Sequence, residues 1–151
     1  MDERSVLGRT FPGIAGYSTY IPLSRDQVML LLVAVNEIFL GIDTYLAHMI
    51  SGTIVFREWI PVIFGPVAGV LLLLAGLVAL RWRNFASTLA TLVLLASIGV
   101  GVVGSYYHFY RAALPGAPPG HRISVYLLIW APPILGPLSF ALVGWLGMSA
   151  A

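Results

Sequence analysis

Residues 36–48 read Asn-Glu-Ile-Phe-Leu-Gly-Ile-Asp-Thr-Tyr-Leu-Ala-His, which sets polar and ionisable side chains inside a long apolar segment. On a helix that advances about 100° per residue, Glu37, Gly41 and His48 fall along one line of the surface. Asn36 and Asp43 fall along the neighbouring line. Ionisable groups at membrane depth are costly unless a partner or a wet cavity receives them, so each is a candidate functional residue.

The composition is that of a membrane protein. Of the 151 residues, 59% are hydrophobic and 9% are charged, and the mean hydropathy is +0.93. Soluble domains carry about 25% charged residues, whereas about 20 apolar residues per crossing allow about four helices here. The formal charge of +2 is too small to predict nucleic-acid binding. The absence of cysteine excludes disulfides and thiolate metal sites.

The predicted crossings follow from apolar runs and their breaks. Residues 1–24 contain no apolar signal-peptide core, so we expect a cytoplasmic or interfacial strap. Ser24 and Gln27 have the spacing of a capping box, which predicts a helix that begins at Arg25. The four-helix transmembrane domain, 25–151, is predicted to cross at 25–50, 59–80, 85–110 and 123–148. The fourth crossing begins either at Ile123 or near Pro132, because proline is tolerated in a first helical turn.

The arginines predict the orientation of this multi-pass protein in the cell membrane. Four crossings place both termini and the second loop on one side. That side holds five of the eight basic residues, which are Arg4, Arg9, Arg25, Arg81 and Arg83. The excess predicts that both termini are cytoplasmic, and it places His48 and His108 toward the outer face.

An internal repeat predicts the architecture. Residues 59–66 and 130–137 share the pattern W-x-P-x-x-x-G-P. A glycine also stands seven residues before each of two histidines, in the pairs Gly41/His48 and Gly101/His108. We therefore predict an all-α, polytopic membrane four-helix bundle. Its two tandem helix hairpins would be related by a pseudo-twofold axis along the membrane normal.

His48 and His108 form the first candidate site. The first and third crossings run in the same direction, so the two imidazoles at their outer ends share a depth. Imidazole is a standard axial ligand, and the pair predicts haem b between them. Gly41, Gly101 and Gly104 would let a flat macrocycle approach the backbone. In the alternative interpretation these glycines allow close helix packing, and the histidines are polar groups at the membrane interface.

A metal site without haem is a second interpretation of the same end of the protein. His48, His108, His121 and Glu58 supply nitrogen and oxygen ligands suited to zinc, copper or iron. No spacing in the sequence places two of these ligands on one helical face, which weighs against this interpretation.

Glu37 is the candidate for proton or ion chemistry. It lies about 15 Å along the first helix from Gln27, near the bilayer centre, where an unpaired carboxyl group favours its protonated form. With Asn36 and Asp43 it could line a proton or cation path beside proline-broken helices. The alternative is a structural carboxyl group that bonds Asn36 or a nearby backbone group and holds helices together.

These patterns favour a small integral membrane subunit of a larger, energy-converting complex, with a role in electron transport if haem b is bound. The alternatives are a proton- or cation-conducting protein that uses Glu37, and a purely structural or assembly protein. We expect contacts with lipid and with other membrane subunits or further copies of the chain. We expect no enzymatic activity from the chain alone, because it has no phosphate-binding glycine loop and no serine in a nucleophile elbow.

Overall fold

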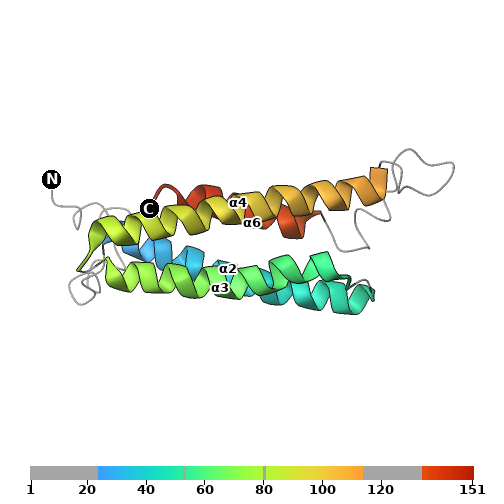
Figure 1. Cartoon of the computed structure of the whole chain (residues 1–151), viewed down its shortest axis with the longest axis horizontal. Helices are drawn as coiled ribbons and strands as arrows, with labels where there is room; N and C mark the ends of the chain where they lie inside the picture. The colour runs from blue at the N-terminus through green and yellow to red at the C-terminus, as the bar shows by residue number, and fades with distance from the viewer. Residues whose placement is uncertain (1–23, 53, 80, 114–133) are drawn as a thin grey trace, which may run out of the picture.

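The computed structural model describes residues 24–52, 54–79, 81–113 and 134–151, and in these ranges the chain is helical without strands. The helices are α2 (Arg25–Ser51), the short 3-10 helix η2 (Phe56–Glu58), α3 (Trp59–Val78), α4 (Arg83–Ala113) and α6 (Leu135–Gly147). The α-helices lie along the long axis of the molecule, and α2 begins at the end where α6 finishes (Figure 1). The predicted all-α class is confirmed for the described residues.

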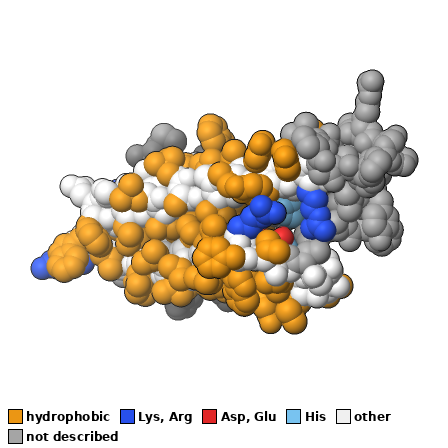
Figure 2. All heavy atoms as spheres, turned by 45° about the vertical axis from the view of Figure 1, so that its right-hand side comes forward, with side chains coloured by type: hydrophobic (Ala, Val, Ile, Leu, Met, Phe, Trp, Pro, Cys, Tyr) orange, Lys and Arg blue, Asp and Glu red, His pale blue; other side chains and the backbone are white. Residues whose placement is uncertain are grey.

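Three of these helices are long and apolar enough to cross a membrane. They are α2, the continuous segment Phe56–Val78, and α4 as far as Arg111. Large apolar side chains such as Leu32, Phe39 and Trp145 point outward, and apolar groups cover much of the surface in Figure 2. Because such a surface suits acyl chains better than water, these findings indicate an integral membrane protein with transmembrane helices.

The fourth predicted crossing, 123–148, is described only over α6, which has 13 residues. This length corresponds to about 20 Å, less than the hydrocarbon core of a bilayer. The two predicted starting points, Ile123 and Pro132, both lie outside the described residues.

Local sequence signals set the two ends of α2. The predicted capping box is confirmed, since the Gln27 amide donates to Ser24 Oγ over 3.2 Å and the Ser24 amide donates to the Gln27 side chain over 2.9 Å. The helix ends at Gly52, whose φ of 62° is left-handed. Glycine adopts this conformation without the steric cost of a Cβ, so it stops the helix before η2 begins.

Helix α2 packs most extensively on α3, and α4 packs most extensively on α6. Glycines bring the backbones together in both pairs. A Cβ on Gly65 would lie 2.6 Å from the carbonyl oxygen of Glu37, and one on Gly144 would lie 2.8 Å from the carbonyl oxygen of Leu94. Small residues thus allow the close approach that stabilises helix pairs in lipid, where no hydrophobic effect drives helices together.

The buried face of α4 repeats that of α2 at an offset of 60 residues, the separation of Glu37 from Ser97. Corresponding buried positions are Leu30 and Ala90, Val33 and Val93, Ala34 and Leu94, Glu37 and Ser97, and Gly41 and Gly101. Both faces join one apolar core with side chains of α3, including Ala68 and Leu72. Two of the buried polar side chains, Glu37 and Ser97, therefore stand at matched positions of two helices.

Candidate functional site

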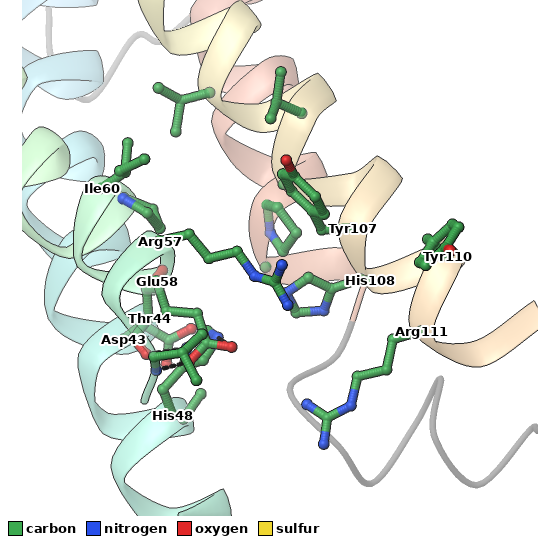
Figure 3. Close-up of a pocket in the computed structure, with 18 of the residues that line it drawn as sticks. Asp43, Thr44, His48, Arg57, Glu58, Ile60, Tyr107, His108, Tyr110 and Arg111 are labelled. Carbon is green, nitrogen blue, oxygen red and sulfur yellow. Dashed lines mark hydrogen bonds and ion pairs between the residues drawn. The ribbon is translucent and has the colours of Figure 1, made fainter. Parts of the chain in front are cut away.

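A cavity of about 760 Å³ opens near the end of the molecule where α2 finishes and α4 reaches its last turns. Its wall includes His48 from α2 and His108 from α4, together with residues of η2, α3 and the start of α6 (Figure 3). Figure 2 shows basic, acidic and histidine side chains gathered around this hollow in an otherwise largely apolar surface. The cavity is thus the place where the described part of the chain concentrates polar chemistry.

His48 is held in a defined orientation on α2. Its side chain is buried, and Nδ1 lies 2.7 Å from the carbonyl oxygen of Thr44, one helical turn earlier. A carbonyl oxygen only accepts, so Nδ1 carries the proton and donates it. In the neutral ring, Nε2 is then the nitrogen with the free lone pair. A histidine whose other ring nitrogen donates a hydrogen bond binds a metal through such a lone pair.

Glu58 faces His48 from the 3-10 helix η2. Its Oε1 lies 3.9 Å from His48 Nε2, an ion-pair distance that exceeds the length of a hydrogen bond. Its Oε2 accepts from the Val55 amide over 2.9 Å, which fixes the carboxylate at the start of η2. The local turn between α2 and α3 therefore holds an acidic group beside the imidazole.

The structure brings His48 and His108 together. Their ring centroids are 5.9 Å apart, and the ring planes are inclined by 85°. Metal–imidazole nitrogen bonds are about 2 Å long, so one metal ion between two opposed imidazoles sets their centroids about 6 Å apart. The separation of the two rings thus matches that of a pair sharing one metal, with each ring supplied by a different long helix.

Among the described residues, no group of three or more histidine, aspartate or glutamate side chains is arranged to hold a metal ion. His121, one of the ligands in the second interpretation, lies outside the described residues. The described members of that predicted ligand set are His48, His108 and Glu58.

The three glycines that were predicted to let a cofactor approach the backbone differ in their surroundings. Gly41 lies against Gly65 and Pro66 of α3, and a Cβ on Gly101 would meet Ala141 and Pro137 of α6. Both contacts are those of close helix packing. Gly104 lines the cavity, and a Cβ there would lie 2.7 Å from Pro137 Cβ.

Gly99 is a cavity residue that sequence reasoning missed. It lines the cavity, and among the described residues no side chain and no atom of another helix lies within 4 Å of a Cβ built on it. The available signal was its place two residues before Gly101 in the same glycine-rich run of α4. Backbone at this position is therefore open to a ligand in the cavity.

Two arginines at the cavity were also missed as site residues, because sequence reasoning used them only to predict orientation. Arg57 and Arg111 both line the cavity and are exposed. Arg57 Cζ lies 5.0 Å from the ring centroid of Tyr107, within the range of a cation–π contact. The cavity therefore has basic groups as well as acidic ones at its wall.

Glu37, Asn36 and Asp43 occupy three different environments. Glu37 is fully buried in the core, whereas Asp43 is exposed and lines the cavity. Asn36 is exposed two turns before Asp43 on the same side of α2, and it donates from Nδ2 to the carbonyl oxygen of Leu32 over 2.9 Å. The structure thus does not gather the three predicted proton or ion residues into one site.

The partner of Glu37 is Ser97, which sequence reasoning missed. Ser97 Oγ is within hydrogen-bond distance of Glu37 Oε1 and lies 3.0 Å from the carbonyl oxygen of Phe140 in α6. One hydroxyl has one proton to donate. That proton can be shared between the Glu37 carboxyl oxygen and the Phe140 carbonyl oxygen, so the Ser97 hydroxyl links α4 to both α2 and α6.

Comparison with protein-family models, with curated proteins and with solved structures finds no match to this chain.

Proposed function

We propose that this protein binds haem b in the membrane, with His48 and His108 as the two axial ligands. The observation that carries the proposal is the 5.9 Å separation of the two imidazole centroids at the wall of one cavity. Two axial imidazoles fill both open positions of a haem iron, so the chemistry supplied by the bound group is one-electron transfer. No substrate needs to reach the iron for this function.

The surroundings of the two rings support the proposal. Pockets for small cofactors measure about 300–1,000 Å³ and are mostly apolar with a few fixed polar groups. The cavity of about 760 Å³ has apolar wall residues such as Ile60, Val100 and Val103. The Thr44 carbonyl group orients His48 and fixes its tautomer, as an outer partner does for a metal-binding histidine.

The proposed architecture is a multi-pass four-helix bundle of two tandem hairpins, α2–α3 and α4–α6. Two observations support it: the buried positions of α2 and α4 correspond at an offset of 60 residues, and each hairpin places a proline-bearing segment against glycine. The arginine distribution favours cytoplasmic termini. In that orientation the haem lies toward the outer face of the cell membrane.

The proposed biological role is that of a small subunit in a larger, energy-converting membrane complex. A one-electron carrier needs a donor and an acceptor. Within the described residues we find a single histidine pair suited to a redox cofactor, so partner subunits or further copies of the chain would exchange electrons with it.

The test is an absorption spectrum of the chain purified in detergent after expression with a haem supply. We expect a Soret band and reduced-state bands of a six-coordinate, two-imidazole haem. His48→Ala and His108→Ala should each abolish this spectrum, and added imidazole should partly restore it. Thr88→Ala is the matched control, because Thr88 is exposed and its hydroxyl donates to the Asn84 carbonyl group of its own helix. A colourless wild-type protein under haem saturation would refute the proposal.

A second candidate function is proton or cation transfer through Glu37. The observation that favours it is a fully buried carboxyl group whose Oε2 has no hydrogen-bond partner among the described residues, beside a serine that can relay a proton. Glu37→Gln should then abolish flux in liposomes loaded with a pH-sensitive dye, and Thr88→Ala should not. If both candidates fail, the structural or assembly role is the remaining proposal.

A further inference from the structure

We infer that Arg57 and Arg111 form a carboxylate-binding subsite that holds the two propionate groups of the haem at the cavity mouth. This inference rests on the proposed haem function and adds the groups that set the orientation of the macrocycle. It concerns the two arginine side chains at the cavity, which are distinct from the histidines proposed to bind the iron.

Arg111 is placed by the helix that carries His108. The two residues are three positions apart on α4, so their side chains lie on the same face about one turn from each other. Both line the cavity. Figure 3 shows the Arg111 side chain extending from α4 into the space below His108. A group bound at the His108 imidazole is therefore within reach of this guanidinium.

Arg57 reaches the same region from η2. Its guanidinium carbon lies 5.0 Å from the ring centroid of Tyr107, the residue before His108. The Tyr107 ring offers a surface that holds the cation against α4 without neutralising its charge. The two arginines thus reach the cavity around His108 from different elements, Arg57 from η2 and Arg111 from α4 (Figure 3).

The acidic groups of the cavity lie elsewhere along its wall. Figure 3 shows Asp43 and Glu58 around His48, whereas the Arg57 guanidinium group lies beside His108 and the Arg111 guanidinium group lies below it. Glu58 is already engaged with the Val55 amide and faces His48 Nε2. Within the described residues neither arginine forms an ion pair. Among the described residues, the cavity wall therefore has its acidic groups near His48 and two arginines that form no ion pair.

The chemistry of the two arginines selects carboxylates. A guanidinium is a rigid fork that binds a carboxylate through two parallel hydrogen bonds, and it stays charged at all physiological pH values. Arg57 follows the last turn of α2, and Arg111 lies in the last turn of α4, so both stand at the water-facing end of the spans. A haem with its macrocycle among the apolar wall residues and its carboxylates at this end satisfies both environments.

The test compares iron protoporphyrin IX with its dimethyl ester, which has the same macrocycle and iron but no carboxylate charge. Haem affinity is measured by spectral titration of the full chain in nanodiscs of neutral phosphatidylcholine. The variants are Arg57→Gln, Arg111→Gln and the double variant, with Arg81→Gln as the matched control. Arg81 is exposed and lies between α3 and α4, whereas the cavity lies near the ends of α2 and α4.

We expect the wild type and Arg81→Gln to bind the diacid about tenfold or more tightly than the ester. Each single variant should reduce this preference, and the double variant should remove it. All five proteins should keep the two-imidazole spectrum, because the axial histidines are unchanged. The quantity compared is the ratio of the affinity for the diacid to that for the ester. A general loss of folding would weaken both affinities alike and leave this ratio unchanged.

The failure of this inference is distinguishable from the failure of the proposed function. A wild-type protein that shows the two-imidazole spectrum but binds both compounds equally overturns the inference and leaves haem binding intact. A wild-type protein that gives no such spectrum with either compound overturns both. Addition of phosphatidylglycerol tests lipid phosphate as the alternative anion: if it protects the wild type from unfolding more than the double variant while the haem preference is absent, the arginines bind headgroups and the inference is wrong.

Discussion

Ser97 of α4 contacts the buried carboxyl group of Glu37 in α2 and lies 3.0 Å from the carbonyl oxygen of Phe140 in α6. The three residues link three helices through one side-chain hydroxyl. Glu37 and Ser97 also occupy matched positions, since they are 60 residues apart on helix faces with the same burial pattern. The relationship explains how an acidic side chain is accommodated in an apolar core, and it yields the first prediction.

Ser97→Ala should destabilise the protein by about 1–3 kcal/mol, because it leaves the buried carboxyl oxygen of Glu37 without its partner. Glu37→Leu combined with Ser97→Ala should recover most of that loss, because two apolar groups leave no unsatisfied carboxyl group. The measurement is thermal or denaturant unfolding in detergent. Thr88→Ala serves as the control, and a double variant less stable than both single variants would contradict the pairing.

The surroundings of three glycines predict opposite effects on stability when each is replaced by alanine. Gly65→Ala and Gly144→Ala should each cost about 1–3 kcal/mol, because the added Cβ meets backbone atoms of the facing helix. Gly99→Ala should instead be neutral or stabilise by up to about 1 kcal/mol, because its Cβ enters open space within a helix. Unfolding in detergent measures all three. Equal losses at the three sites would contradict the packing described.

A side chain that fills the cavity should prevent haem binding without destabilising the fold. Gly99→Phe places a large ring on a cavity wall where nothing lies within 4 Å of the Cβ. We expect loss of the Soret band while the melting temperature of the haem-free protein stays close to that of the wild type. Gly99→Ala is the matched control and should retain haem. Full haem loading of Gly99→Phe would show that the ligand lies elsewhere.

The charged groups at the cavity should shift the haem potential in opposite directions. Glu58→Gln removes a negative charge near His48 and should raise the midpoint potential by about tens of millivolts. Arg57→Gln removes a positive charge and should lower the potential by a similar amount. Spectroelectrochemical titration measures both. Glutamine at position 58 can still accept from the Val55 amide, so the turn should be preserved, and shifts of the same sign would contradict the assignment of charges.

The start of α2 was predictable because its signal is local. The capping box at Ser24 and Gln27 needs four consecutive residues, and the same bonds occur in the structure. The approach of His48 to His108 was a prediction from two spans that run in the same direction. The partner of Glu37 was not predicted, because a side chain 60 residues away cannot be identified from helical periodicity alone.

Hydropathy and helical periodicity, which depend only on neighbouring residues, determined that this chain is helical, that it has spans suited to a membrane, and that Glu37 and His48 share one face of α2. Only the tertiary structure decided that Ser97 meets Glu37, that Asn36 points outward, and that Arg57 and Arg111 line the histidine cavity. The reason is physical. Which faces of the helices meet, and at what register, depends on contacts such as Gly65 of α3 on Gly41 of α2 and Pro137 of α6 on Gly101 of α4.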